Sequence, residues 1–170
     1  MGFFDKLTGT KYPDSGVAPL PTMEVRAALL ALNDTGVPFG VRNAHPAEKA
    51  DLVAQWRVME PAVGSALSRK QLERTLKIRM RLVPGTREVR TLDEQWTVTW
   101  AGDSPRRAVS REYGRGPVPM VSKEWTYERG PEGRRRKVET FSFDTRDMKN
   151  PLRNAVLDAG WTWRGVLFRL

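Results

Sequence analysis

The residues of this 170-residue chain that could support acid–base chemistry are its one histidine and two pairs of carboxylates. His45 precedes a proline in a predicted loop, and the nearby Glu48 is the acid that could orient it as a general base. A lone loop histidine is more often simply solvated, and a single histidine excludes a multi-histidine metal site. Asp93–Glu94 and Asp144 with Asp147 form the carboxylate pairs, although acids are also common in turns.

The sequence patterns of common enzymes are missing. There is no GxSxG, HExxH, P-loop or GxGxxG motif, and there is no cysteine to act as nucleophile or zinc ligand. Residues 114–117 read GRGP, but a glycine-rich loop cradles phosphate when it opens a helix, and a strand pattern follows this one. We therefore expect no enzyme activity, no cofactor and no metal, and carboxylate-only catalysis has no further support.

Positive charge is the strongest chemical feature of the chain. The formal net charge is +9, and residues 66–90 and 104–137 carry +6 each, against −3 for the remainder. A positive field of this kind favours nucleic acid, acidic lipid or an acidic protein surface as partner. A basic surface that only keeps an arginine-rich chain soluble is an alternative of equal weight.

The cations fall on two predicted hairpins. One has strands over 121–129 and 137–143, with Tyr127 on the first strand and a basic cluster at the tip. Aromatic rings beside cations are typical of single-strand-binding surfaces, although rings that alternate along a strand more often face a core. The anion-binding candidates are Arg134, Arg135, Arg136 and Lys137 at this tip, and Lys77, Arg79 and Arg90 on the other hairpin.

That other hairpin, over residues 76–100, is the element around which the chain is organised. Apolar residues from Leu76 to Leu82 alternate with cations, which predicts a strand with one buried face. Pro84 and Gly85 predict a tight turn that pairs Leu82 with Arg87. We expect Trp96 and Trp100 to share the inner face with the apolar residues of the first strand.

Apolar periodicity and capping residues predict the remaining elements. Helices are expected near 23–33 and over 151–159, the latter capped by Asn150, and a short helix is expected from a capping box that starts at Ser68. Further strands are expected over 39–43 and 51–59 and from residue 161 onward. The predicted fold class is α+β: a curved, mainly antiparallel β-sheet, half-barrel or barrel-like, with two or three short amphipathic helices.

The chain divides into three predicted parts. Residues 1–8 form an amphipathic segment, residues 9–21 a proline- and glycine-rich linker, and residues 22–170 a single α+β domain. Phe3, Phe4 and Leu7 are partner-docking candidates, since the linker separates them from the domain. Because the segment has little positive charge, we expect it to dock in a protein groove rather than on a bilayer.

No apolar run approaches the about 20 residues that span a bilayer, and the N-terminal residues lack a secretory signal pattern. We therefore expect a cytoplasmic protein, with peripheral contact to a membrane as an alternative.

Three stretches carry a resemblance to a known group of proteins. They are residues 56–58 (WRV), residues 88–90 (EVR) with Trp96 and Trp100 downstream, and residues 159–166 (AGWTWRGV). In these stretches the chain resembles small bacterial proteins from high-GC genomes for which no activity is known. The resemblance implies one domain that includes the C-terminal residues, and it implies no function.

Three functions fit the sequence. The first is a non-catalytic binding module that engages an acidic protein or an anionic membrane surface. The second is a nucleic-acid-binding protein that uses the same basic hairpins. The third is a sheet whose tryptophans line a pocket for a lipid or small ligand, and homo-oligomerisation is compatible with all three.

Overall fold

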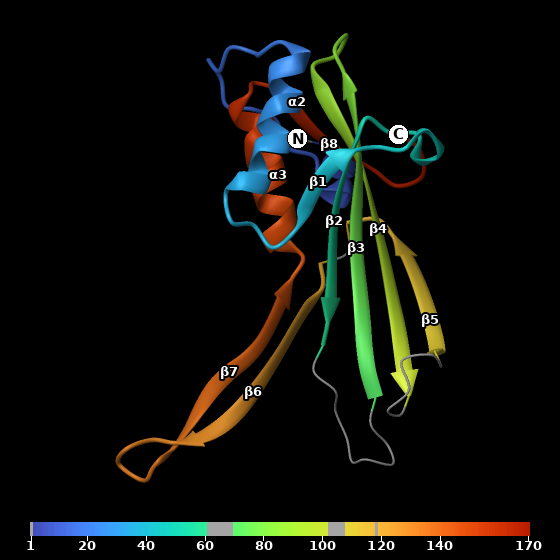
Figure 1. The fold of residues 1–170 in the computed structure, drawn as a ribbon. Helices are drawn as coiled ribbons and strands as arrows, with labels where there is room; N and C mark the ends of the chain where they lie inside the picture. Colours follow the sequence, from blue (N-terminus) through green and yellow to red (C-terminus); the bar gives the residue numbers. More distant parts are fainter. Residues whose placement is uncertain (1, 61–69, 102–107, 118) are drawn as a thin grey trace.

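The computed structural model describes residues 2–60, 70–101, 108–117 and 119–170. Within them the chain has an α+β fold whose sheet is mostly antiparallel (Figure 1), as the sequence predicts. The helical elements are α1 (Phe3–Thr8), α2 (Thr22–Ala31), η1 (Leu32–Asp34), η2 (Pro46–Glu48) and α3 (Arg146–Asp158). The strands are β1 (Gly40–Asn43), β2 (Leu52–Met59), β3 (Lys70–Val83), β4 (Glu88–Ala101), β5 (Ala108–Arg115), β6 (Val121–Arg129), β7 (Arg135–Asp144) and β8 (Thr162–Val166).

The main sheet is built on the long hairpin of β3 and β4. Its strand order is β1-β2-β3-β4-β5, and β8 also pairs with β4. β8 lies parallel to residues 88–92 of β4, whereas β5 lies antiparallel to residues 94–100, so the two strands share one edge of β4. The strands that the structure describes form an open sheet and do not close into a barrel.

The core lies between one face of this sheet and the helices α2 and α3 (Figure 1). Ile78 and Met80 of β3 are fully buried there, together with Leu29 of α2 and Leu152 of α3. This is the face that the apolar alternation of β3 predicts. The opposite face of the sheet, called the outer face below, carries Lys77, Arg79 and Arg81, because successive side chains of a strand point to opposite sides.

The register of the central hairpin differs from the predicted one by two residues. Leu82 pairs with Val89 rather than with Arg87, because the loop takes four residues, 84–87. Arg87 has a left-handed backbone with φ 50°, which places it in the loop rather than in the strand. The prediction for the tryptophans is also wrong: Trp96 pairs with Thr75 and Trp100 with Gln71, so both lie on the outer face.

Three other predicted elements need correction. Residues 70–75 belong to β3 and not to a short helix, whereas Ser68 lies outside the described residues. β5 has no counterpart among the strands that the sequence predicts. Helix α3 begins at Arg146 rather than at Pro151, and Asp144, which precedes the N-cap residue Thr145, accepts a hydrogen bond from the Arg146 N–H.

β6 and β7 form a two-stranded arm, separate from the main sheet, that projects away from the body of the protein (Figure 1). At its base the Phe143 ring lies against Trp56 of β2, with ring centroids 4.7 Å apart, and Phe143 is buried. The Met120 N–H donates to the Thr145 hydroxyl, and the Thr145 N–H donates to the Met120 carbonyl. These contacts anchor the base of the arm, while its tip extends into solvent.

Residues 9–21 contain no helix and no strand of the sheet, but they pack along the end of the chain. Lys11 and Trp163 exchange backbone hydrogen bonds of 2.8 and 2.9 Å, and the indole N–H of Trp161 donates to the Leu20 carbonyl. Thr10 is buried, and its hydroxyl accepts from the Gly165 N–H. The stretch is therefore attached at both ends, to β8 through Thr10 and Lys11 and to Trp161, just before β8, through Leu20.

Candidate binding surfaces

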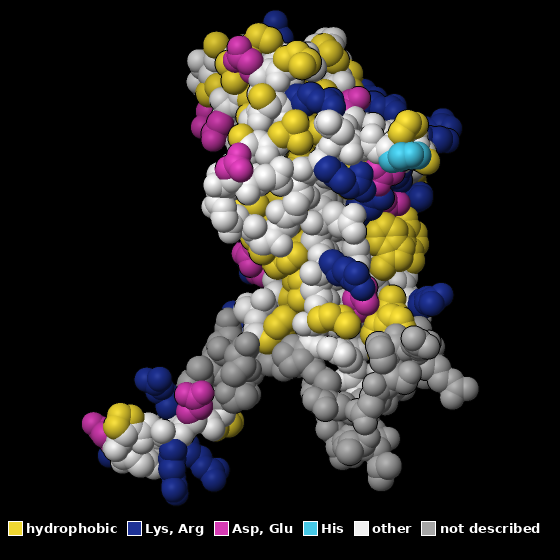
Figure 2. All heavy atoms as spheres, in the orientation of Figure 1, with side chains coloured by type: hydrophobic (Ala, Val, Ile, Leu, Met, Phe, Trp, Pro, Cys, Tyr) yellow, Lys and Arg dark blue, Asp and Glu magenta, His cyan; other side chains and the backbone are white. Residues whose placement is uncertain are grey.

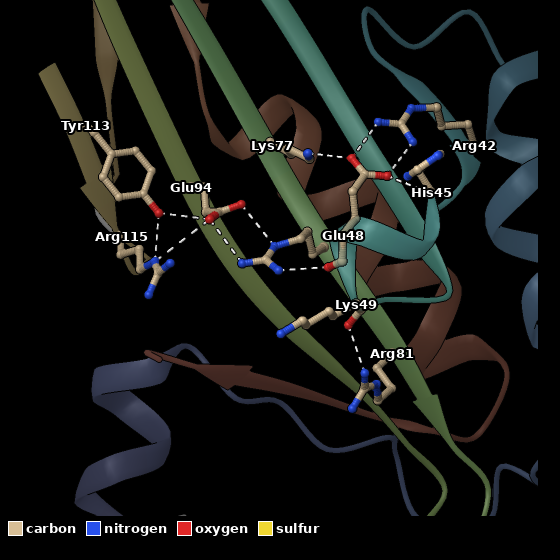
Figure 3. A network of polar contacts seen from close by, with 10 residues as sticks. Arg42, His45, Glu48, Lys49, Lys77, Arg81, Glu94, Tyr113 and Arg115 are labelled. Atoms are coloured by element: carbon tan, nitrogen blue, oxygen red, sulfur yellow. Dashed lines mark hydrogen bonds and ion pairs between the residues drawn. The ribbon is translucent and has the colours of Figure 1, made fainter. Parts of the chain in front are cut away.

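A network of ion pairs covers the outer face of the sheet (Figure 3). At its centre the Glu94 carboxylate accepts two hydrogen bonds from Arg79, of 3.0 and 3.1 Å, and one from the Tyr113 hydroxyl. Arg115 lies 3.8 Å from the same carboxylate and donates to the Tyr113 hydroxyl. One buried carboxylate thus serves two cations from two different strands.

Glu48, the last residue of η2, likewise binds two cations with one carboxylate. Its carboxylate accepts two hydrogen bonds of 2.8 Å from Arg42 and forms an ion pair with Lys77. The hydrogen bonds from Arg42, followed by those from Lys77 and the His45 N–H, hold the pKa of Glu48 well below its ordinary value against the opposing effect of burial. Glu48 therefore stays ionised and ties the η2 loop to β1 and β3.

Glu88 is a third shared carboxylate, and it is 4% exposed. Burial raises its pKa, but hydrogen bonds from Arg164 and Arg90 outweigh this effect, so that its pKa lies below the ordinary value. Three of the anion-binding candidates, Lys77, Arg79 and Arg90, are therefore each paired with a carboxylate of the protein itself. An external anion would have to compete with these internal ion pairs.

His45 is not arranged as a general base. Its Nδ1 accepts a hydrogen bond from the Ala47 N–H, and the Glu48 carboxylate binds the backbone N–H of His45 rather than the imidazole ring. The geometry is that of a helix cap on η2. The two residues that the sequence suggests as a dyad thus close a loop.

Neither carboxylate pair forms a shared acidic site. Asp93 and Glu94 point to opposite faces of β4, where Asp93 pairs with Lys149 of α3 at 2.6 Å and Glu94 with Arg79. Asp144 accepts hydrogen bonds from Arg146, which lower the pKa of its carboxyl group. Among the described residues no group of acidic or histidine side chains could hold a metal ion.

The tip of the arm carries the other candidates, and its two faces differ. In the register of β6 and β7, Arg129 lies opposite Arg135 and Tyr127 opposite Lys137, whereas Glu128 lies opposite Arg136. Directly paired residues share a face, so one face of the tip bears three cations and a tyrosine ring. All four side chains are exposed, and Figure 2 shows Lys and Arg side chains gathered at this end of the molecule.

The N-terminal candidates also lie at the surface. Phe3 and Phe4 are 78% and 74% exposed, with their rings edge to face, and Leu7 is 51% exposed. α1 itself is held close to β8 through Thr8 and Thr10, whose hydroxyls are 2.8 Å apart. The structure thus presents the three side chains to solvent on a segment that is attached to the domain.

The core side of the sheet leaves little room for a ligand. A pocket between β3, β4 and α3, lined by Leu76, Ile78 and Lys149 among others, has a volume of about 60 Å³. Drug-sized ligands occupy about 300–1,000 Å³. Among the tryptophans whose side chains the structure describes, Trp161 and Trp163 are buried, and both pack in the core.

The alternation of β3 gave the positions of its cations, but the carboxylates that pair with them are missed by sequence reasoning. Glu48 comes from η2, Glu94 from the middle of β4 and Glu88 from its start, so only the tertiary fold brings them to the cations. The available signal was that all three acids lie in or beside predicted strands, where a solvent-facing carboxylate can pair across to a neighbouring strand.

No protein family, no curated protein and no solved structure matches this chain. None of the described helices has the length and apolar character needed to cross a membrane. The resemblance to small bacterial proteins and the cytoplasmic location remain predictions.

Proposed function

We propose that this protein is a non-catalytic binding module whose β6–β7 arm engages an acidic surface, on a protein partner or on an anionic membrane. The observation that carries the proposal is the cationic face of the arm tip, made by Arg129, Arg135 and Lys137. Like charges directly opposite each other on two strands are destabilising, so Arg129 opposite Arg135 is unfavourable for the arm alone. An anionic partner would relieve this repulsion.

The position of the arm supports the same function. Its base is fixed to β2 through Phe143 and Trp56, while the tip stands clear of the main sheet (Figure 1). The cations of the main sheet are mostly paired with Glu48, Glu88 and Glu94, whereas Arg134, Arg135 and Arg136 form no ion pair with any residue that the structure describes. The tip is thus the more accessible source of positive charge.

Nucleic acid is the second candidate partner, and Tyr127 is the observation that favours it. Its ring is 69% exposed and lies on the same face as the three cations. Exposed aromatic rings beside cations stack with bases, and a two-stranded ribbon fits the major groove of duplex DNA. The same four side chains would then contact bases and phosphates.

A comparison of the two faces of the tip tests both candidates. We expect Arg129→Gln combined with Arg135→Gln to weaken binding to phosphatidylserine vesicles or to the acidic partner about tenfold, since each lost charge-assisted contact is worth about 1.5–3 kcal/mol before screening. The matched control is Arg136→Gln with Arg134→Gln, which removes the same charge and spares the face that carries Tyr127. Equal weakening in both variants would show that only net charge matters and would refute the cationic face as the contact.

The salt dependence of binding separates the partners. Binding to an oligonucleotide should fall with salt by a slope of about −0.9 per phosphate contact on duplex DNA, and Tyr127→Ala should weaken it further. Capture of a protein partner should survive nuclease treatment. If neither vesicles, oligonucleotides nor a nuclease-resistant partner bind, the arm is not a binding element.

A further inference from the structure

A second cationic site lies on the outer face of the sheet, away from the arm. The last residues of the chain, 168–170, lie over this face and form with it a partly open pocket of about 380 Å³. The pocket walls come from the residue that follows η2, from β3, β4 and β5, and from these last residues. They consist of Lys49, Arg79, Arg81, Leu92, Arg115, Phe168, Arg169 and Leu170.

Positive charge exceeds negative charge in this pocket. Five lining side chains are cationic, and Glu94 is the carboxylate that pairs with two of them, Arg79 and Arg115. Counting the main-chain carboxyl group of Leu170 as a further negative charge still leaves an excess of three. Glu48 and Glu88 pair with cations elsewhere on this face. No carboxylate side chain in the described part of the chain pairs with Lys49, Arg81 or Arg169.

Arg81 is held in place by main-chain oxygen atoms rather than by a carboxylate side chain. Its Nη2 donates to the Lys49 carbonyl at 2.8 Å and its Nη1 to the Leu170 carbonyl at 3.3 Å. Arg81 of β3 pairs with Arg90 of β4, and Arg90 pairs with Arg164 of β8. Three arginines therefore lie side by side on three neighbouring strands. Glu88 pairs with the last two of these, and no carboxylate side chain among the described residues pairs with Arg81.

Three of the four arginines of the pocket, Arg79, Arg81 and Arg115, are held in orientation by hydrogen bonds, whereas Arg169 is exposed and forms none with the described residues. Arg79 is clamped by two bonds to Glu94 and a third to the Glu48 carbonyl, and Lys49 sits at a backbone φ of 51° at the end of η2. Figure 3 shows Lys49, Arg81 and Arg115 around the same part of the sheet. Fixed guanidinium groups match the oxygens of phosphate, and little entropy is lost when such groups bind.

We propose that this pocket binds a small phosphate-bearing ligand, with Arg81, Lys49 and Arg169 as its contacts and with Arg79 and Arg115 adding to the positive field. Its volume lies within the range of small-molecule sites, about 300–1,000 Å³. Phe168, which is 79% exposed at the rim, offers a ring against which an apolar or aromatic portion of the ligand would pack. The site is distinct from the arm and does not depend on the function proposed for it.

Titration of the full chain with inorganic phosphate and with pyrophosphate tests this site, by calorimetry at constant ionic strength. We expect saturable binding with a Kd below about 1 mM for pyrophosphate. Arg169→Gln and Arg81→Gln should each weaken it about tenfold. The matched control is Arg134→Gln on the arm, which removes one exposed arginine and should leave the Kd unchanged.

Two results would overturn the proposal: no saturation with pyrophosphate, or equal weakening by Arg134→Gln and the pocket variants, which would indicate a diffuse effect of net charge. Because Arg81 also holds the last residues of the chain, its variant is checked by thermal melting. If the Arg81→Gln variant is unfolded, the pyrophosphate affinity of Arg169→Gln alone tests the proposal. Arg169 is exposed and forms no hydrogen bond or ion pair with the residues described, so its replacement should not affect folding. Loss of partner binding in the arm variants with intact pyrophosphate binding would show that the two sites are independent.

Discussion

Replacing Gly165 by alanine should undock the N-terminal stretch from β8. A Cβ atom at this position would overlap the Thr8 carbonyl oxygen and lie 2.8 Å from the Thr8 carbonyl carbon, and backbone atoms cannot yield as a flexible side chain does. Gly165 is not among the residues with positive φ, so alanine is acceptable to its own backbone. The substitution therefore acts on the neighbouring segment and not on β8 itself.

The expected loss follows from the contacts that would break. They are the two backbone hydrogen bonds between Lys11 and Trp163 and the bond from the Gly165 N–H to the Thr10 hydroxyl. A typical intramolecular hydrogen bond contributes about 0.5–1.5 kcal/mol net. We expect the free energy of unfolding to fall by about 2–3 kcal/mol, which corresponds to a decrease in Tm of about 4–12 °C for a protein of this size.

Thermal and urea unfolding of three variants would measure this effect. Gly114→Ala is the matched control, because Gly114 is also a strand glycine without positive φ and no atom lies within 4 Å of its added Cβ. It should change stability by no more than about 0.5 kcal/mol. In a chain that begins at residue 12, Gly165→Ala should lose its effect, and an undiminished effect there would refute the argument.

Three other changes have expected outcomes. Glu48→Gln should lower the free energy of unfolding at pH 7 and should make it decline less as the pH falls. The pKa of Glu48 is depressed in the folded state, so the carboxylate stabilises the fold above its ordinary pKa of 4.5, and this stabilisation is lost as the pH falls below that value. Urea titrations at about pH 5 and pH 3 would measure the difference. Phe143→Ala should lower the free energy of unfolding by about 3–5 kcal/mol, because it is a large-to-small change at a buried position. Tyr127→Ala on the same arm should lower it by at most about 0.5 kcal/mol, and similar losses in both variants would contradict the assignment of Phe143 to the anchored base. Reversing Arg134, Arg135 and Arg136 to Glu should leave Tm nearly unchanged, within about 0.5 kcal/mol of stability, and a large drop would mean that the tip packs on the body.

Local pattern was sufficient to predict the strands of the main hairpin, the arm and helix α2, because each has a clear apolar face or a clear turn. The register of the hairpin was not predictable in this way, since it depends on Arg87 adopting a left-handed backbone that favours glycine or asparagine. The start of α3 was missed for a related reason. Pro151 is typical of the first turn of a helix, yet here the helix already begins at Arg146, so Pro151 lies inside it.

The attachment of residues 9–21 was the largest omission. Their prolines and glycines indicate the absence of regular structure, which is correct, but say nothing about whether the stretch is bound. The available signal lay at the other end of the chain, in Gly160 and Gly165. A glycine inside a strand, such as Gly165, often marks the close approach of another backbone. Gly160 lies in the turn before β8, where an added Cβ would be 2.7 Å from Pro19.

The pairing of β8 with β4 also constrains the order in which this protein can fold during synthesis. The bond from Trp161 to Leu20 joins residues 141 positions apart, and that from Gly165 to Thr10 spans 155 positions. Residues 10–20 and residues 88–92 of β4 therefore remain without these partners until β8 has left the ribosome. Contacts of such long sequence separation slow folding, because the entropy of closing the loop is lost before the contacts form. Until then the exposed edge of β4 is the part of the nascent chain most open to pairing with another strand.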